Sequence, residues 1–281
     1  MRVRLFLFAG LATLLAVPAI ADPFSFSTGA PDGLMGMASR PGSAGSLETE
    51  AADDFILNAQ TTFLNTGTFV GLLPSNLNLA TDISQVRVEI YRVFPKDSDT
   101  VRTINVPTRA NSPSDVEFDD RDTASNNLTY TATLVDDAFA VANSVDNGIN
   151  PKPNQNTLGE GPVRGQEVQF DVTFTTPFDL PPDHYFFIPQ VLLSNGDFLW
   201  LSAPKPIVGG TPFLPDLQTW IRNANLDPDW LRVGTDIVGT GAFNGTFSLQ
   251  GETVPEPSSC ILLGSALLAL AGIVRKKLPR R

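Results

Sequence analysis

The chain has 281 residues, a formal net charge of −11 and a single cysteine, Cys260. This acidity disfavours nucleic acid and anionic membrane as partners, because both require cationic patches on the protein. One cysteine excludes an internal disulfide, so a folded body must rely on a buried core, which a chain of roughly 200 residues or more can form.

The first 21 residues predict a secretory signal peptide. Arg2 and Arg4 give a basic start, residues 5–17 are apolar, and Ala19 and Ala21 are the small residues of a cleavage site. The apolar run is too short for a comfortable membrane span. We therefore expect signal peptidase to cut after Ala21 and the remaining chain to be exported across the inner membrane.

Residues 253–281 predict a membrane-sorting segment. Residues 258–274 carry no charge and would form a helix of roughly 26 Å, near the lower limit for crossing a bilayer. Five cationic residues follow the apolar span and form what we call the cationic stop: Arg275, Lys276, Lys277, Arg280 and Arg281. By the positive-inside rule, this end of the chain stays in the cytoplasm. The prolines of Pro255-Glu256-Pro257 prevent the helix from extending backwards. A plain C-terminal anchor is the alternative.

Pro255, Glu256 and Pro257, followed by the apolar span and the basic end, resemble the sorting segment of the PEP-CTERM family. The resemblance covers about the last 28 residues. It implies recognition of the tripeptide by an exosortase, an integral-membrane cysteine transpeptidase or protease that cuts nearby and removes the helix. It also implies a transiently anchored protein that ends at the cell surface or in the extracellular matrix of a Gram-negative bacterium making exopolysaccharide.

Removal of both ends would make the body more acidic. It takes away seven of the 19 Lys and Arg but none of the 30 Asp and Glu, which leaves about −18 on residues 22–257. Such a body attracts cations, including Ca²⁺.

Short segments of alternating polarity predict a mainly β fold. In residues 84–92 and 167–174, apolar side chains alternate with polar ones, as in strands with one wet face. Further strands are expected at 62–72, 128–135, 185–193, 198–203, 231–233 and 246–250. This number of strands without long helices favours one antiparallel β-sandwich or jelly-roll-like domain over residues 51–252.

Four other segments complete the expected organisation. Residues 22–50 are rich in Gly, Ser, Ala and Pro and are expected to be an irregular leader with one edge strand at most. Residues 136–143 have a short helical pattern. Residues 95–127 and 143–166 exceed hairpin length, and long loops are where β domains place binding sites.

No motif for an enzyme is present, and we expect none of the residues to be catalytic. His184 is the only histidine, no G-x-S-x-G, H-E-x-x-H or phosphate-binding loop occurs, and a lone histidine is usually structural. A glycoside hydrolase or lyase needs only two carboxylates at the correct separation. The sequence offers many acidic pairs and favours no single one; they include Asp53-Asp54, Asp115–Asp122, Asp136-Asp137, and Asp227 with Asp229.

Two further ligand types are considered. No cofactor is required, but a structural Ca²⁺ would suit loop carboxylates, with candidates at Asp97, Asp99, Asp119, Asp120 and Asp122. Trp230, beside two aspartates, is the candidate for stacking on a sugar ring.

The first functional expectation is a structural or adhesive surface protein in an exopolysaccharide or biofilm context. The alternative is a carbohydrate-binding module.

Overall fold

The computed structural model describes residues 21–58, 60–149 and 156–254, and these form two β-sheets. The signal peptide, the Pro255-Glu256-Pro257 motif, the apolar span and the cationic stop lie outside the described residues. Within those ranges, no helix has the length and apolar character needed to span a membrane.

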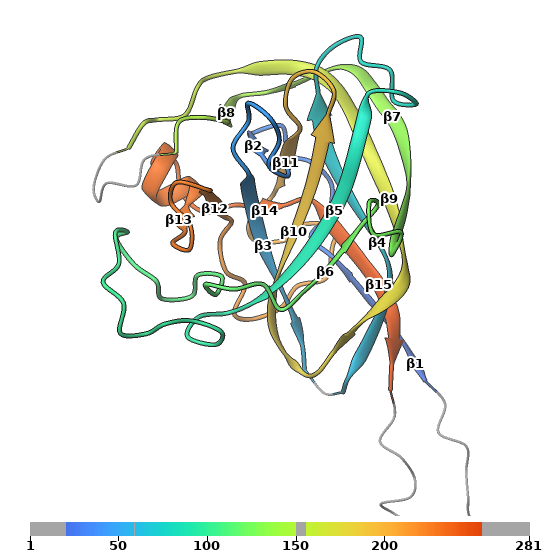
Figure 1. The fold of residues 1–281 in the computed structure, drawn as a ribbon, viewed down its shortest axis with the longest axis vertical. Helices are drawn as coiled ribbons and strands as arrows, with labels where there is room; N and C mark the ends of the chain where they lie inside the picture. The colour runs from blue at the N-terminus through green and yellow to red at the C-terminus, as the bar shows by residue number, and fades with distance from the viewer. Residues whose placement is uncertain (1–20, 59, 150–155, 255–281) are drawn as a thin grey trace, which may run out of the picture.

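A larger sheet has nine strands, and its main path runs β1-β15-β4-β11-β2-β8, with β9 on the other side of β4, β7 beyond β9, and β14 beside β11 (Figure 1). Its strands are β1 (Asp22–Ser27), β2 (Met35–Ala38), β4 (Thr62–Leu73), β7 (Leu128–Val141), β8 (Asn143–Val145), β9 (Val163–Leu180), β11 (Leu199–Ala203), β14 (Asn244–Gly245) and β15 (Phe247–Thr253).

A smaller sheet has six strands in the order β13-β12-β3-β10-β5-β6. Its strands are β3 (Thr49–Leu57), β5 (Ile83–Arg92), β6 (Asp119–Asp122), β10 (Asp183–Leu193), β12 (Trp220–Asn223) and β13 (Leu231–Arg232), and a short π-helical turn, η2 (Val233–Val238), follows β13. The mainly β expectation is confirmed.

Aromatic side chains from both sheets form one core. Phe187 of β10 stacks on Phe247 of β15 with ring centroids 4.8 Å apart, and it lies 6.4 Å from Phe69 of β4. Phe69 in turn stacks on Phe170 of β9 at 5.0 Å. All four rings are buried. Because the inward-facing residues of two sheets interdigitate in this way in packed sheets, the arrangement is compatible with a β-sandwich.

Three expectations about segments need correction. Residues 22–50 are not an irregular leader, because β1 pairs along its length with β15 and β2 pairs with β11. The segment 136–143 is not helical: residues up to Val141 continue β7 and pair with the long β9, whose backbone supplies the hydrogen-bonding partners. The sheets are also not wholly antiparallel, since β2 and β8 pair in parallel.

β7 lies at one edge of the larger sheet, and among the described strands it pairs with β9. Its register shifts twice, between Leu134 and Asp136 and between Asp136 and Phe139. Such irregularities are β-bulges, which bend and twist a strand locally.

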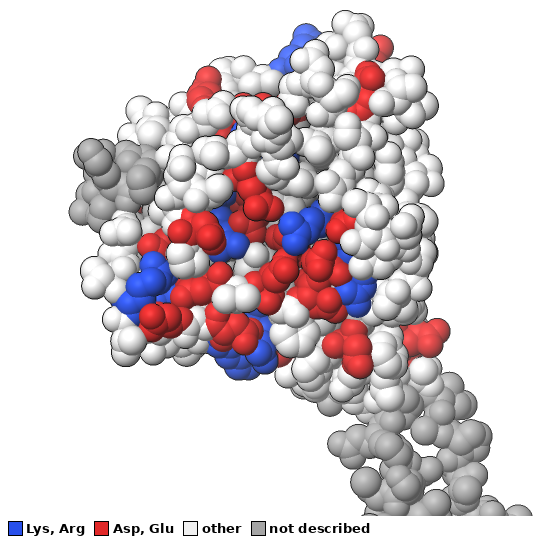
Figure 2. All heavy atoms as spheres, in the orientation of Figure 1, with Lys and Arg blue, Asp and Glu red and all other residues white. Residues whose placement is uncertain are grey.

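The outer face of the smaller sheet carries a buried ion-pair network. Glu50 of β3 receives hydrogen bonds from Arg222 of β12 and from the Tyr91 hydroxyl at 3.0 Å each. Beside it, Arg87 of β5 pairs with Glu89 at 2.7 Å and with Glu117 at 3.1 Å. Figure 2 shows acidic side chains interspersed with Arg and Lys over this face. Several carboxylates here share one cation, since Arg87 also lies 3.4 Å from Glu48 and 3.5 Å from Asp120.

The first and last described strands leave the fold at the same end. Asp22 of β1 and Thr62 of β4 both lie opposite Thr253 of β15. β4 then crosses the sheet to Leu73, and its 12 residues extend roughly 36 Å at about 3.3 Å per residue. Figure 1 shows β1 and β15 side by side at the lower end, with β2 and β8 at the upper end.

Candidate functional site

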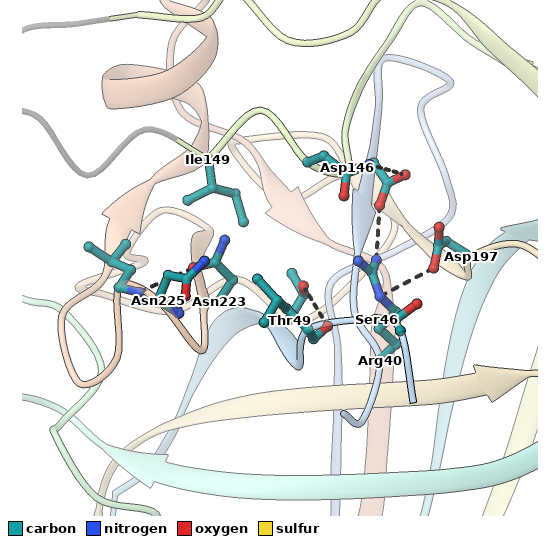
Figure 3. Close-up of a pocket in the computed structure, with 12 residues that line it drawn as sticks. Arg40, Ser46, Thr49, Asp146, Ile149, Asp197, Asn223 and Asn225 are labelled. Carbon is teal, nitrogen blue, oxygen red and sulfur yellow. Dashed lines mark hydrogen bonds and ion pairs between the residues drawn. The ribbon is translucent and has the colours of Figure 1, made fainter. Parts of the chain in front are cut away.

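A pocket of about 400 Å³ lies among loops that meet beside β2 and β12 (Figure 3). Arg40 and Ser46 come from the β2–β3 connection, Asp146 follows β8, Asp197 precedes β11, and Asn223 ends β12. The pocket thus collects polar side chains from four separate parts of the chain.

Arg40 is the centre of this pocket. Its Nη1 donates to Asp146 Oδ1 at 2.9 Å, and its Nε lies 3.2 Å from Asp197 Oδ1. The backbone N–H of Arg40 donates to the carbonyl of Thr49, and the N–H of Thr49 donates to the carbonyl of Arg40. These two hydrogen bonds fix the backbone from which the guanidinium projects. Its side chain is only 6% exposed. A buried cation of this kind requires its carboxylate partners.

Asp146 and Asp197 act as a pair. Burial and then the charge of Asp197 raise the pKa of Asp146 above its usual value, although Arg40 opposes the shift. Both carboxylates contact the same guanidinium, so Arg40 offsets part of the repulsion between them.

Glu160 fixes the loop that bears Asp146. The carboxylate of Glu160 accepts the backbone N–H of Asp146 at 2.5 Å and that of Asn147 at 2.7 Å. On the other wall, Asn223 Oδ1 accepts from the N–H groups of Asn225 and Leu226, each at 3.1 Å. Both walls are thus shaped by side chains bonded to local backbone, a common way of ordering loops.

A second pocket of about 450 Å³ shares Asp146 and Asp197 with the first. Its lining adds the ends of three strands, with Leu73 from β4, Val163 from β9 and Leu199 from β11. We call the two adjoining pockets the Asp146–Asp197 groove. Each volume falls within the range of about 300–1,000 Å³ usual for small-ligand sites.

The groove lies at the end of the fold remote from Asp22 and Thr253. Leu72 and Leu73, which line it, end β4, whereas Thr62 at the start of β4 pairs with Thr253. The long segment 143–166 supplies Asp146 and Glu160 to the lining of the groove. The other long segment, 95–127, contributes instead to the covering of the smaller sheet, where Ser114 accepts from the Trp230 ring nitrogen.

Trp230 does not present a sugar-stacking face in this structure. Its side chain is 2% exposed, its Nε1 donates to the Ser114 carbonyl at 3.1 Å, and the Arg222 guanidinium lies over its ring at 4.4 Å. The expectation for this residue was wrong because the aspartates beside it bind arginines: Asp227 pairs with Arg222 at 2.7 Å and Asp229 with Arg102 at 2.5 Å. The Arg222 guanidinium and the Tyr91 ring pack against the indole.

The five aspartates considered for Ca²⁺ have other partners. Asp97 pairs with Arg92 at 2.5 Å, Asp119 with Arg121 at 2.6 Å, and Asp120 lies 3.5 Å from Arg87. The carboxylates of the other two accept local backbone N–H groups: Asp99 from Val101 and Asp122 from Ser125. In the described ranges, no group of three or more His, Cys, Asp or Glu has the arrangement of a metal site.

The other acidic pairs are placed differently. Asp53 Oδ2 accepts the Gly245 N–H at 2.8 Å, and Asp54 Oδ2 lies 2.6 Å from Nε2 of His184. Burial and the neighbouring charge of Asp54 raise the pKa of Asp53 well above its usual value. Both side chains are almost completely inaccessible, so this pair holds strands together. Asp136 caps the backbone N–H of Ala138.

Comparisons with known proteins give no relative: no family model, no curated protein and no solved structure matches this chain.

Proposed function

We propose that this chain is an exported surface or extracellular-matrix protein, sorted by an exosortase through Pro255-Glu256-Pro257, and that it is a structural or adhesive component in an exopolysaccharide or biofilm context. The fold we propose for its body is a jelly-roll-like β-sandwich. One observation carries the proposal: Asp22 and Thr253 lie opposite each other at the end of the fold remote from the Asp146–Asp197 groove.

This placement suits a protein whose chain is processed at both of its ends. The proposed signal peptide joins the body just before Asp22, and the proposed sorting segment joins it at residue 253. While the tail is still in the membrane, the strand end with Thr253 would face the bilayer. The groove, about 36 Å farther along β4, would then face outward.

A binding role suits the groove better than hydrolysis. Glycosidases hold their two carboxyl groups about 5 Å or more apart so that a sugar, or a sugar and a water, fits between them. Asp146 and Asp197 instead share Arg40, which lies 2.9 Å from the first carboxylate and 3.2 Å from the second. Groups engaged in this way are suited to hold a ligand rather than to attack it.

The sorting half is tested by expressing the full chain with and without an exosortase. We expect a shorter product at the surface or in the matrix when the enzyme is present and an uncut, membrane-associated product when it is absent. Glu256→Gln keeps the size of the motif and should reduce processing, while Glu252→Gln is the matched control on β15. Identical mobility and location in both strains would refute the proposal.

A carbohydrate-binding module is the second candidate, and the groove favours it. Charged and amide side chains that offer several hydrogen bonds in fixed directions lie beside aliphatic ones, as a sugar with hydroxyl edges and C–H faces requires. Affinity electrophoresis through gels containing neutral polysaccharides would test this candidate by retardation of the protein.

A further inference from the structure

The two halves of the Asp146–Asp197 groove differ in chemistry. The half around Arg40 is lined mainly by hydroxyl, amide and carboxyl groups, among them Asn223 and Asn225. The other half contains more aliphatic side chains; Leu72, Leu73, Pro74, Val163 and Leu199 line it together with Ser75, Ser144, Glu160 and Arg164. Asp146 and Asp197 lie where the halves meet, because both line each pocket.

Hydrogen-bonding capacity in the polar half is incompletely used. Arg40 Nε is buried and lacks an aligned hydrogen bond, although Asp197 Oδ1 is 3.2 Å away. Because this atom is almost inaccessible, a ligand would instead meet the exposed polar groups at the rim of the pocket. Asn225 is exposed at the rim of the same pocket.

The aliphatic side chains of this half come from two clusters. Leu72 and Leu199 belong to a small cluster on the outer face of the larger sheet, with Val163 packed against it, whereas Leu73 belongs to the main core. Where these side chains line the groove, they offer van der Waals contact and no hydrogen bonds. They therefore match a methyl group better than a hydroxyl group, because a buried hydroxyl without a partner loses its hydration.

The charges of the groove disfavour an anionic ligand. Its lining carries three carboxylates, Asp146, Asp197 and Glu160, against two cations, Arg40 and Arg164. The body around it is strongly acidic. Like-charge repulsion therefore disfavours uronate-containing or sulfated polymers.

We propose that the Asp146–Asp197 groove binds a neutral oligosaccharide that carries methyl groups. The hydroxyl edge is held by Asp197 and Asn225, and the methyl lies on Val163 and Leu199. Two kinds of sugar supply this chemistry: acetamido sugars, whose methyl belongs to an N-acetyl group, and 6-deoxyhexoses. The inference rests on the second candidate function, carbohydrate binding, and adds the class of sugar.

Isothermal titration calorimetry on protein made from the full-length chain tests the proposal with four probes of equal length. These are tri-N-acetylchitotriose, a rhamnose trisaccharide, cellotriose and trigalacturonate. We expect at least one methyl-bearing probe to bind more tightly than cellotriose, by about fourfold for each methyl group buried. Trigalacturonate should bind most weakly. The identity of the methyl-bearing probe that binds shows whether the methyl group belongs to an acetamido sugar or to a 6-deoxyhexose.

Two substitutions separate the halves of the groove. Val163→Thr keeps the shape of the side chain and should reduce the preference over cellotriose, whereas Val135→Thr, on exposed β7, should leave it unchanged. Asn225→Ala should weaken all neutral probes by a similar factor, with Asn105→Ala as the control. Circular dichroism melting of each variant shows that it is folded.

The proposal is overturned if no neutral probe binds, if cellotriose binds as tightly as the methyl-bearing probes, or if trigalacturonate binds best. It is also overturned if Val163→Thr leaves the preference intact. Exosortase-dependent processing is measured separately in cells, so a negative titration with normal processing would remove the sugar site and leave the sorting proposal standing.

Discussion

The Arg222 guanidinium lies over the ring of Trp230, 4.4 Å from its centroid, and the ring of Tyr91 meets that of Trp230 edge-on at 5.6 Å. These three side chains are buried on the outer face of the smaller sheet. A tryptophan in this position is a packing residue, and its removal should be visible in stability.

Trp230→Ala is expected to lower the free energy of unfolding by about 3–5 kcal/mol, because it removes a large buried ring and its cation–π contact. Leu214→Ala is the control; its side chain is 89% exposed, and the change should stay within about 0.5 kcal/mol. Urea unfolding followed by circular dichroism measures both. A near-zero loss for Trp230→Ala would contradict the buried position.

Breaking the Arg222–Glu50 pair should cost more than breaking an exposed one. Arg222→Met leaves the Glu50 carboxylate buried without its cation, which is expected to cost about 3–5 kcal/mol. The double variant Arg222→Met/Glu50→Leu should recover part of this loss because it removes both charges. Lys96→Met breaks a pair whose lysine is 51% exposed and should cost at most about 1 kcal/mol. A double variant less stable than Arg222→Met would contradict the explanation.

Gly71→Ala should destabilise the protein through a local clash. A Cβ on Gly71 would lie 1.9 Å from Cε2 of the Phe198 ring, which is buried and packed against Phe170. Overpacking of this kind costs about 1–3 kcal/mol. Gly42→Ala is the matched control, because its Cβ would meet Glu48 at an ordinary 3.5 Å. Equal melting temperatures for the two variants would be inconsistent with this packing.

Stability should fall as the pH rises from mildly acidic to mildly alkaline values. Burial, followed by the charge of a neighbouring acid, raises the pKa of Asp53 and of Glu89 well above the usual value. A carboxyl whose pKa is raised on folding holds more protons in the folded state. Its contribution is therefore fully present below the unfolded pKa of about 4 and is lost as the pH rises through the folded pKa.

Melting curves between pH 4.5 and 8.5, a range set by those pKa directions, measure this dependence. Glu89→Gln imitates the protonated side chain and should flatten the slope, while Glu252→Gln on β15 should not. A melting temperature that increases steadily with pH would show that the sign is wrong.

The strands with regular alternation were predictable from the sequence. In β5, Val86, Val88 and Ile90 are buried in the core between the sheets, as their spacing required. Residues 136–141 were misassigned as a helix because Ala138, Phe139 and Val141 also fit a helical spacing over so short a segment. The pairing of Phe139 with Gly165 and of Val141 with Val163 decides the matter, and such pairing is set by a partner strand far along the chain.

The candidate site was not predictable residue by residue. Arg40, Asp146 and Asp197 come from separate loops, and each lies in a segment rich in Gly, Ser or Asn that resembles any surface turn. The one available signal was the length of the segment 143–166. Trp230 was misleading for the opposite reason: its acidic neighbours suggested exposure, but they pair with Arg222 and Arg102, and Arg222 lies over the ring.

The irregular edge strand β7 has a consequence for how copies of this protein can associate. An exposed, regular edge is a template on which another strand can add, and repeated addition gives fibres. The two register shifts around Asp136 interrupt the repeat of β7, and Asp136 and Asp137 place charge at the break. Such an edge disfavours strand-to-strand polymerisation through β7, so that in the extracellular layer we propose for this protein, cohesion would have to come from other surfaces.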